Sequence, residues 1–231
     1  MEKVLIIGLD LSFNSTGICI SYLEDKIAKN LSFHRIKFDD ESNKTGKKYT
    51  PNTIKNVNDI IYRMPTNLLT EDLVLDLEDK NNYEQCHLTL KSIICSKKIS
   101  LLINENIIKY SPDKIIFSFE NYVMPSYEGP TQLKSVSGLI TLQGHVRKDS
   151  IQLCLQNNVK VQIYTPTPSS NKLFFTKDGN ADKLKMLVFF IKYYDGNKLL
   201  PTVTIDDVGK VNDIIDAFSL MMNAFSKYKN N

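Results

Sequence analysis

The stretch Val4–Leu23, VLIIGLDLSFNSTGICISYL, decides the fold. Its first part, Val4–Leu11, is a nearly continuous apolar run, which is typical of a strand buried on both faces of a sheet. A second strand is predicted over Thr16–Leu23, and the turn-forming residues Ser12–Ser15 join the two. A third strand is predicted over Ile27–Phe38. Three strands in such quick succession predict an antiparallel meander at the start of the chain.

The rest of the chain alternates between helix and strand. Apolar residues at helical spacing predict helices over Thr53–Arg63, Leu88–Tyr110, Thr131–Gln156, Asn180–Tyr194 and Asn212–Tyr228. Two more strands are predicted over Lys114–Phe119 and Val159–Tyr164. Asn180 is the expected N-cap of its helix, while Asp39–Asn52 and Asp195–Gly209 are expected to be loops. This order predicts an α/β fold in which helices flank a mixed five-stranded sheet.

Composition describes an ordinary globular chain of 231 residues, with 42% hydrophobic and 24% charged residues. The net charge of +3 permits nucleic-acid binding but does not demand it. The four cysteines form no Cys-x-x-Cys pair, which argues against a zinc site and a disulfide framework and for a reducing compartment. No apolar stretch approaches the ~20 residues of a membrane span, so a soluble intracellular protein with no membrane partner is expected.

Two acidic residues follow buried strands directly. Asp10 comes after the run IIGL, and Glu120 comes after IIFSF. Asp10 could simply be a turn-forming residue, and Glu120 could be a partly exposed carboxylate at a strand end. Glutamate is a poor former of both turns and strands, so a structural explanation is harder for Glu120.

Two further acids, Asp213 and Asp216, lie three residues apart in VNDIIDAFSLMM and therefore share one face of a helix. Asp213 is predicted in the first turn, where it could stabilise the helix dipole. That explanation leaves Asp216 unaccounted for, because like charges at this spacing repel. Four acids at two strand ends and one helix face suit Mg²⁺, and two such ions about 4 Å apart can hydrolyse a phosphodiester.

These motifs resemble the RuvC family of Holliday-junction resolvases within the RNase H-like nuclease fold, and in style they are closest to RuvC-like proteins of bacteriophages. The catalytic acids of the family match Asp10 in IIGLDLSFNSTG, Glu120 in KIIFSFENYVM, and Asp213 and Asp216 in NDIIDAFSL. The stretch Pro168–Lys183, PSSNKLFFTKDGNADK, resembles a basic segment of phage relatives that lies near the scissile phosphate.

The resemblance implies a single nuclease domain over 1–231, with 39–110 as an insertion that contains helices and follows the third strand. It implies a crossover junction endodeoxyribonuclease of DNA recombination and repair, with two Mg²⁺ ions per site and Mn²⁺ able to substitute. Metal ligands would be the four acids, with Lys183 as a further catalytic residue. DNA contacts would come from Lys172, Lys177, Lys183, Tyr122 and Asn180.

The expected partners are four-way junction DNA and a second copy of the chain, paired through the helix Thr131–Gln156. The expected location is the cytoplasm, or the host cytoplasm or nucleoid for a phage protein. The bacterial family often has an aromatic residue where this chain has Val123, beside Tyr122. That departure leaves a broader nuclease open, one acting on flaps, forks or RNA–DNA hybrids.

Two other classes stay open. A non-catalytic DNA-binding protein could use the same fold. A sugar or acetate kinase also begins with an aspartate followed by small residues and Thr-Gly. The kinase class needs a glycine-rich loop after a later strand, and here that strand runs into Glu120-Asn121-Tyr122.

Overall fold

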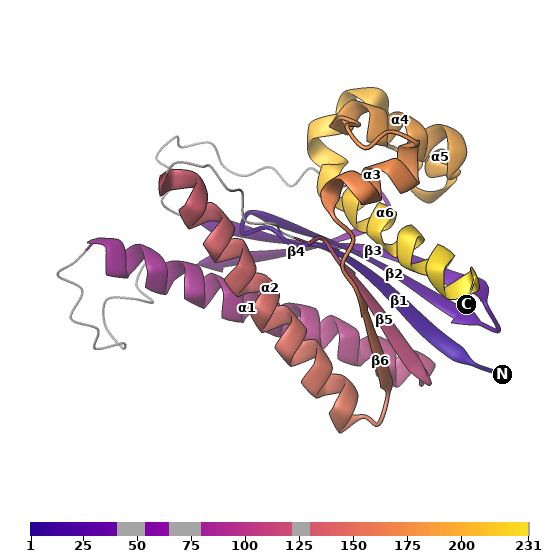
Figure 1. The fold of residues 1–231 in the computed structure, drawn as a ribbon, viewed down its shortest axis with the longest axis horizontal. Coiled ribbons are helices and arrows are strands. Elements are labelled where there is room, and N and C mark those ends of the chain that lie inside the picture. Colours follow the sequence, from indigo (N-terminus) through magenta and orange to yellow (C-terminus); the bar gives the residue numbers. More distant parts are fainter. Residues whose placement is uncertain (41–53, 65–79, 122–129, 231) are drawn as a thin grey trace.

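The computed structural model describes residues 1–40, 54–64, 80–121 and 130–230. Its centre is a six-stranded mixed sheet in the order β4-β3-β2-β1-β5-β6 (Figure 1). The strands are β1 (Lys3–Asp10), β2 (Ser15–Glu24), β3 (Ile27–Asp40), β4 (Val57–Met64), β5 (Lys114–Phe119) and β6 (Lys160–Tyr164). The first three form the predicted antiparallel meander. Strand β5 runs parallel to β1, and β6 runs parallel to β5.

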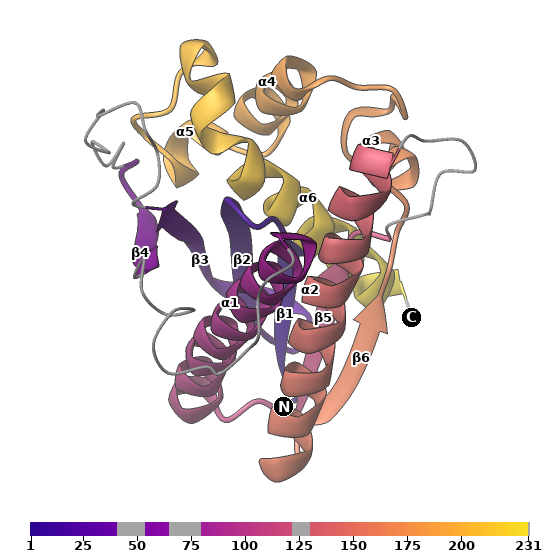
Figure 2. The ribbon, with the colours of Figure 1, turned by 90° about the vertical axis from the view of Figure 1, so that its left-hand side faces the viewer.

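Helices cover both faces of the sheet. They are α1 (Lys80–Tyr110), α2 (Pro130–Gln156), α3 (Pro168–Thr176), α4 (Lys183–Tyr193), α5 (Gly196–Leu199) and α6 (Val208–Asn230), with a 3₁₀ turn over Ile205–Asp207. Figure 2 shows α1 and α2 crossing one face of the sheet, while α6 lies on the other with α3 and α4 beyond it. This layering confirms the predicted α/β architecture, a mixed sheet with helices on its faces.

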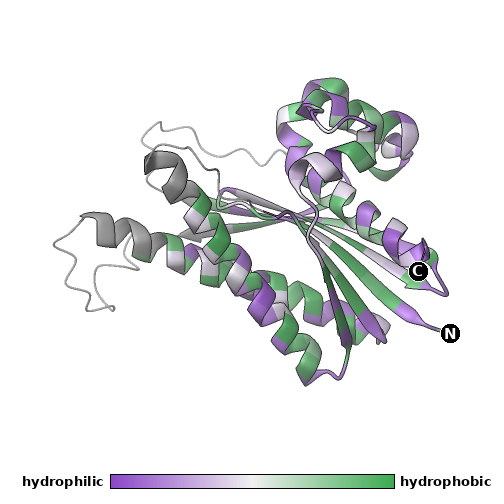
Figure 3. Cartoon of the chain, in the orientation of Figure 1, coloured by the Kyte–Doolittle hydropathy of each residue, from purple (hydrophilic) through white to green (hydrophobic). Residues whose placement is uncertain are grey.

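The central strand β1 is apolar throughout because both of its faces are buried. Val4 and Ile6 pack into the core under α6, whereas Leu5 and Ile7 pack into the core under α1 and α2. The hydropathy colouring in Figure 3 shows this apolar centre, with polar residues along the outer helix surfaces. Packing against these two cores holds the strands in place and so fixes where along the sheet each strand ends.

Two glycines let α6 lie directly on the sheet. A Cβ atom at Gly8 would lie 2.1 Å from the carbonyl oxygen of Ala217, and one at Gly17 would lie 2.0 Å from that of Asp213. Any larger side chain would push the helix backbone away. Gly17 therefore sets how close the acidic part of α6 approaches the ends of β1 and β2.

The prediction of a helix over 53–63 was wrong, because this segment contains the edge strand β4, parallel to β3. The sheet consequently has six strands and not five. The alternation expected of a strand is hidden because Asp59 lies where an apolar residue is expected, paired in register with Arg35. A charged pair buried beneath α6 cannot be read from apolar periodicity.

Part of the region 39–110 contributes to the core of the fold. Its helix α1 packs against α2 and contributes Ile99 and Ile103 to the core on that face. Asp39 and Asp40 extend β3, and the remainder of the loop predicted over 39–52 lies outside the described residues.

Several boundaries near the C-terminus also differ from expectation. The N-cap of α4 is Asp182, whose side chain accepts a hydrogen bond from the backbone N–H of Lys185 at 2.8 Å, so the prediction of Asn180 was wrong. The expected loop 195–209 contains α5, the 3₁₀ turn and the start of α6. Because α6 begins at Val208, Asp213 is not in the first turn, and the helix-dipole explanation for it fails.

The cysteines all carry free thiols, and Cys19 and Cys154 are buried. Within the described ranges, no helix combines the length and apolar character needed to cross a bilayer.

Candidate active site

Asp10 and Glu120 meet at one edge of the sheet. The strands that carry them, β1 and β5, are parallel neighbours, and Leu9 is paired in register with Phe119. The next residue on each strand is the acid, so both carboxylates leave the sheet at the same level. The backbone carbonyl of Glu120 accepts a hydrogen bond from Gln143 of α2 at 2.7 Å, which holds this strand end from the opposite face.

Asp213 and Asp216 approach the same edge from α6. Gly17, which lies beneath the backbone of Asp213, is the register partner of Asp10. A cavity of about 360 Å³ opens there, lined by Asp10, Ser12, Ser15, Arg35, Lys37, Lys183, Gly209, Lys210, Asn212, Asp213 and Asp216. Glu120 lies outside this lining, but its charge acts on Asp10.

The electrostatics of the acids are those of buried like charges. Burial raises the pKa of Asp10 well above its usual value, and the charges of Asp216, Glu120 and Asp213 raise it further. Burial and then the charge of Asp216 raise the pKa of Glu120 to about 7. Burial raises the pKa of Asp216 to about 6, against the lowering influence of Lys172 and Lys183. Near neutral pH the cluster favours an added cation.

Asp213 is the most firmly held of the four. Its Oδ2 accepts a hydrogen bond from the hydroxyl of Ser15, and its Oδ1 lies 3.8 Å from Nη1 of Arg35. Burial raises its pKa, while the Ser15 hydrogen bond and the Arg35 charge oppose that shift. The turn that carries Ser15 is closed by Thr16, whose hydroxyl donates to the carbonyl of Ser12 at 2.8 Å.

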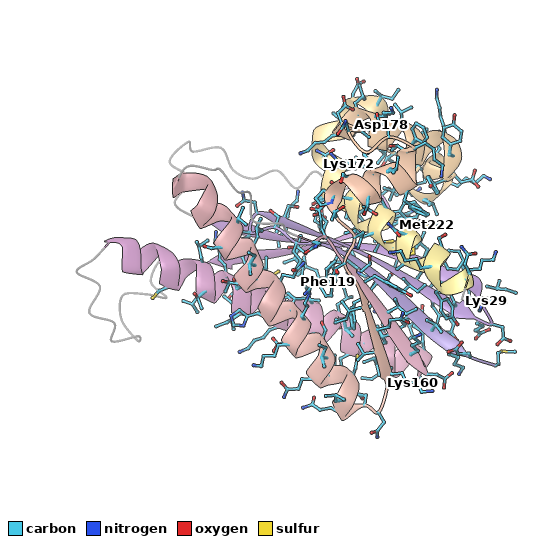
Figure 4. The ribbon with its side chains drawn as sticks, viewed as in Figure 1. Lys29, Phe119, Lys160, Lys172, Asp178 and Met222 are labelled. Carbon is cyan, nitrogen blue, oxygen red and sulfur yellow. The ribbon has the colours of Figure 1, made fainter. Side chains whose placement is uncertain are left out.

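Two lysines face the acids, and each comes from a short helix. Lys183 is the first residue of α4 and lines the cavity with Asp10 and Asp216. Lys172 lies on α3, where its charge lowers the pKa of both Glu120 and Asp216. Figure 4 shows Lys172 beside α6.

The helix that carries Lys172 is attached to α6 by buried polar side chains. Asn171 donates a 2.6 Å hydrogen bond to Ser219 and accepts one from Asn223 at 3.2 Å. Ser219 in turn donates to the backbone carbonyl of Asp216 at 2.8 Å. This chain of hydrogen bonds fixes Lys172 relative to Asp216 of α6.

Several other basic and polar residues of this segment lie away from the acids. Lys177 is exposed at the end of α3 and lies over the ring of Phe174. Lys185 pairs with Asp178 at 2.6 Å. Asn180 is exposed, and its backbone N–H donates to Asp178. The position of Tyr122 lies outside the described residues.

Sequence reasoning missed Arg35, which is 1% exposed and forms a wall of the cavity. One signal was available, because only three of the 29 basic residues are arginines. An arginine in a predicted buried strand of a lysine-rich chain indicates a need for a planar, forked donor.

The donor chemistry of the site fits a hard divalent cation. Asp10, Asp213 and Asp216 present carboxylate oxygens to one cavity, and such oxygens are preferred by Mg²⁺. Across the part of the chain that the structure describes, however, no three His, Cys, Asp or Glu side chains are grouped so that they could hold a metal ion as they stand. Carboxylates that repel one another are expected to stand apart in this way.

Comparisons with known proteins give structural neighbours only. No protein-family model matches the chain, and no curated protein matches it. Among solved structures, Thermus thermophilus RuvC in complex with a Holliday junction substrate has 11% identity and a TM-score of 0.41, covering 97% of this chain and 96% of that one. The yeast mitochondrial Holliday junction resolvase Ydc2 has 13% identity and a TM-score of 0.41, covering 97% and 81%.

A second Thermus thermophilus RuvC structure has 12% identity and the same TM-score, covering 98% of this chain and 96% of that one. These neighbours come from the family that the sequence motifs resemble. At this level of similarity they carry no functional argument, and function rests on the residues of the site.

Proposed function

We propose that the chain is a metal-dependent endonuclease that cuts branched DNA, with the four-way junction as its principal substrate. The observation that carries the proposal is the convergence of Asp10, Glu120, Asp213 and Asp216 from two strand ends and one helix, with two lysines facing them. No structural need of the fold accounts for four acids so placed that the charges of Asp216, Glu120 and Asp213 all raise the pKa of Asp10. A cation and a phosphate together balance such a set of charges.

Mg²⁺ would be held by the four carboxylates, with Mn²⁺ able to substitute and two ions per site. When bound, such ions supply an activated water and stabilise the leaving oxygen of a phosphodiester. The protein's own contribution is positional. Lys183 and Lys172 bring positive charge to where the scissile phosphate would lie, and the Asn171 network keeps Lys172 there.

The DNA partner is proposed from shape and charge and not from base recognition, since the positive groups suit phosphates. We further propose a homodimer, because symmetric cuts across a junction need two sites related by a twofold axis. Leucine and isoleucine side chains exposed on α1 and α2, including Leu101, Ile108 and Leu155, are consistent with such pairing.

Cleavage of labelled four-way junctions, flaps, forks and RNA–DNA hybrids in Mg²⁺ tests the proposal. We expect the junction to be cut best, and Asp10→Asn to lower its cleavage by about 10³-fold or more while junction binding is retained. The control is Asp195→Asn, an exposed acid outside the lining of the cavity, which should cut at the wild-type rate.

If the protein binds junctions but cleaves none of the substrates, it is a non-catalytic DNA-binding protein. Preferred cutting of flaps, forks or hybrids would assign a broader nuclease. If Asp10→Asn cuts at the wild-type rate, the metal site has been assigned to the wrong residues.

A further inference from the structure

A buried cation stands against the acidic site. The Arg35 side chain is 1% exposed, and its Nε and Nη2 donate to the two carboxylate oxygens of Asp59 at 2.7 and 2.8 Å. Its Nη1 donates to the backbone carbonyl of Lys210 at 2.6 Å. The same Nη1 lies 3.8 Å from Oδ1 of Asp213.

Two carboxylates therefore lie within 4 Å of one guanidinium, but they contact it differently. Asp59 receives the paired, bidentate contact, which is the strong form of this interaction. Asp213 lies beyond hydrogen-bonding distance, is 13% exposed and lines the cavity. The arrangement leaves Asp213 near a cation without committing it to that cation.

The acid that makes this possible comes from the edge strand. Asp59 lies on β4 and is paired in register with Arg35 on β3, so the fork is set by strand pairing. Both side chains are on the sheet face covered by α6, because Phe33, two residues before Arg35, contacts Phe218. Asp59 is 9% exposed, which makes its carboxylate a buried partner and not a surface ion.

We infer that Asp59 is a positioning residue that holds Arg35 off Asp213, so that Asp213 stays available to a divalent cation. The inference rests on the proposed function and assigns β4 a part in it. Without Asp59, the buried guanidinium loses the carboxylate that makes its bidentate contact, and removing one partner of a buried ion pair is strongly unfavourable. Asp213 is the carboxylate already within 4 Å of Arg35, and a full ion pair there would compete with the metal.

The test is Mg²⁺ binding, measured without DNA as the Mg²⁺ concentration that gives half of the maximal rise in Tm. We expect Asp59→Asn to raise this midpoint at least tenfold relative to wild type. A crystal structure of the same variant should show Arg35 and Asp213 at hydrogen-bonding distance. An ion pair with a merely structural role would lower the Tm and leave the midpoint unchanged, and that result would overturn the inference.

A double variant separates charge competition from loss of packing. Arg35→Gln combined with Asp59→Asn removes both charges and keeps hydrogen-bonding groups, so we expect a midpoint within about threefold of wild type. If Asp59→Asn alone does not fold, the double variant still decides, because a tenfold higher midpoint in it contradicts the inference. The control is Asp149→Asn, which removes a carboxylate charge on the opposite face, where Asp149 accepts a 2.6 Å hydrogen bond from Ser96. It should leave the midpoint unchanged.

The wild-type protein distinguishes the two levels of failure. If wild type shows no Mg²⁺-dependent rise in Tm, the proposed metal site fails and the inference falls with it. If wild type responds and Asp59→Asn responds with the same midpoint, only the role of Asp59 is wrong.

Discussion

The two faces of the sheet are covered by helices in opposite ways. On one face α6 lies on glycines, with the backbone of Asp213 directly over Gly17. On the other face α1 and α2 lie over large side chains such as Phe117 and Phe119. Gly144 of α2 is exposed, and a methyl group added there would meet no neighbouring atom within 4 Å.

This difference indicates that the two faces of the sheet have different structural roles. The face under α1 and α2 buries bulk, and it is linked to the site by Gln143, which bonds the carbonyl of Glu120, and by Cys95, which contacts Thr16. The face under α6 fixes distances, because a backbone packed on glycine cannot slide without a clash. The acids lie on the face where position is most tightly determined.

The largest effect is expected where a methyl group is added under α6. Gly17→Ala should lower the free energy of unfolding by about 3 kcal/mol or more, because its Cβ would overlap the backbone of Asp213. The control is Gly144→Ala at an exposed position of α2, which should be neutral or stabilise by up to about 1 kcal/mol. Chemical denaturation of both variants measures this contrast, and equal losses would refute the division between the faces.

A smaller effect is expected from the lysines. Lys172→Ala should lower junction cleavage roughly tenfold, because Lys172 faces Glu120 and Asp216. This corresponds to a barrier about 1.4 kcal/mol higher. Lys177→Ala on the same helix and Lys148→Ala on the opposite face should change it less than about twofold. Single-turnover rates at saturating enzyme compare the three variants. A larger loss for Lys177→Ala would place the DNA differently.

The last effect is the pH dependence of stability. The folded-state pKa values of Glu120, about 7, and Asp216, about 6, lie above those of the unfolded chain. Between about pH 4 and pH 7 the folded state holds more protons than the unfolded state. The stability contributed by these groups is therefore fully present at low pH and is lost as the pH rises through that window.

Mg²⁺ should offset the loss only where the acids are ionised. We expect 10 mM Mg²⁺ to raise the Tm by roughly 2–5 °C at pH 7.5 and by less than about 1 °C at pH 5. Differential scanning calorimetry at the two pH values provides the measurement, with Asp10→Asn as the variant expected to respond least. Equal shifts at both pH values would mean that Mg²⁺ acts elsewhere on the molecule.

The sequence by itself determined the meander, β5, β6 and the placement of each acid at the end of an apolar run or within a helix. These features follow from local patterning, because a buried strand must be apolar and must end in a polar residue where it meets solvent. Helix α6 was also predicted, although its start was placed four residues too late.

Only the tertiary structure decided which residues meet. Asp59 looked like a polar position in a helix and is instead the partner of Arg35, 24 residues earlier in the chain. The role of Gly17 depends on a helix about 200 residues later, and the attachment of Lys172 depends on Ser219 and Asn223. Such contacts join segments far apart in sequence, and apolar periodicity carries no record of them because it reports only whether each residue faces a core.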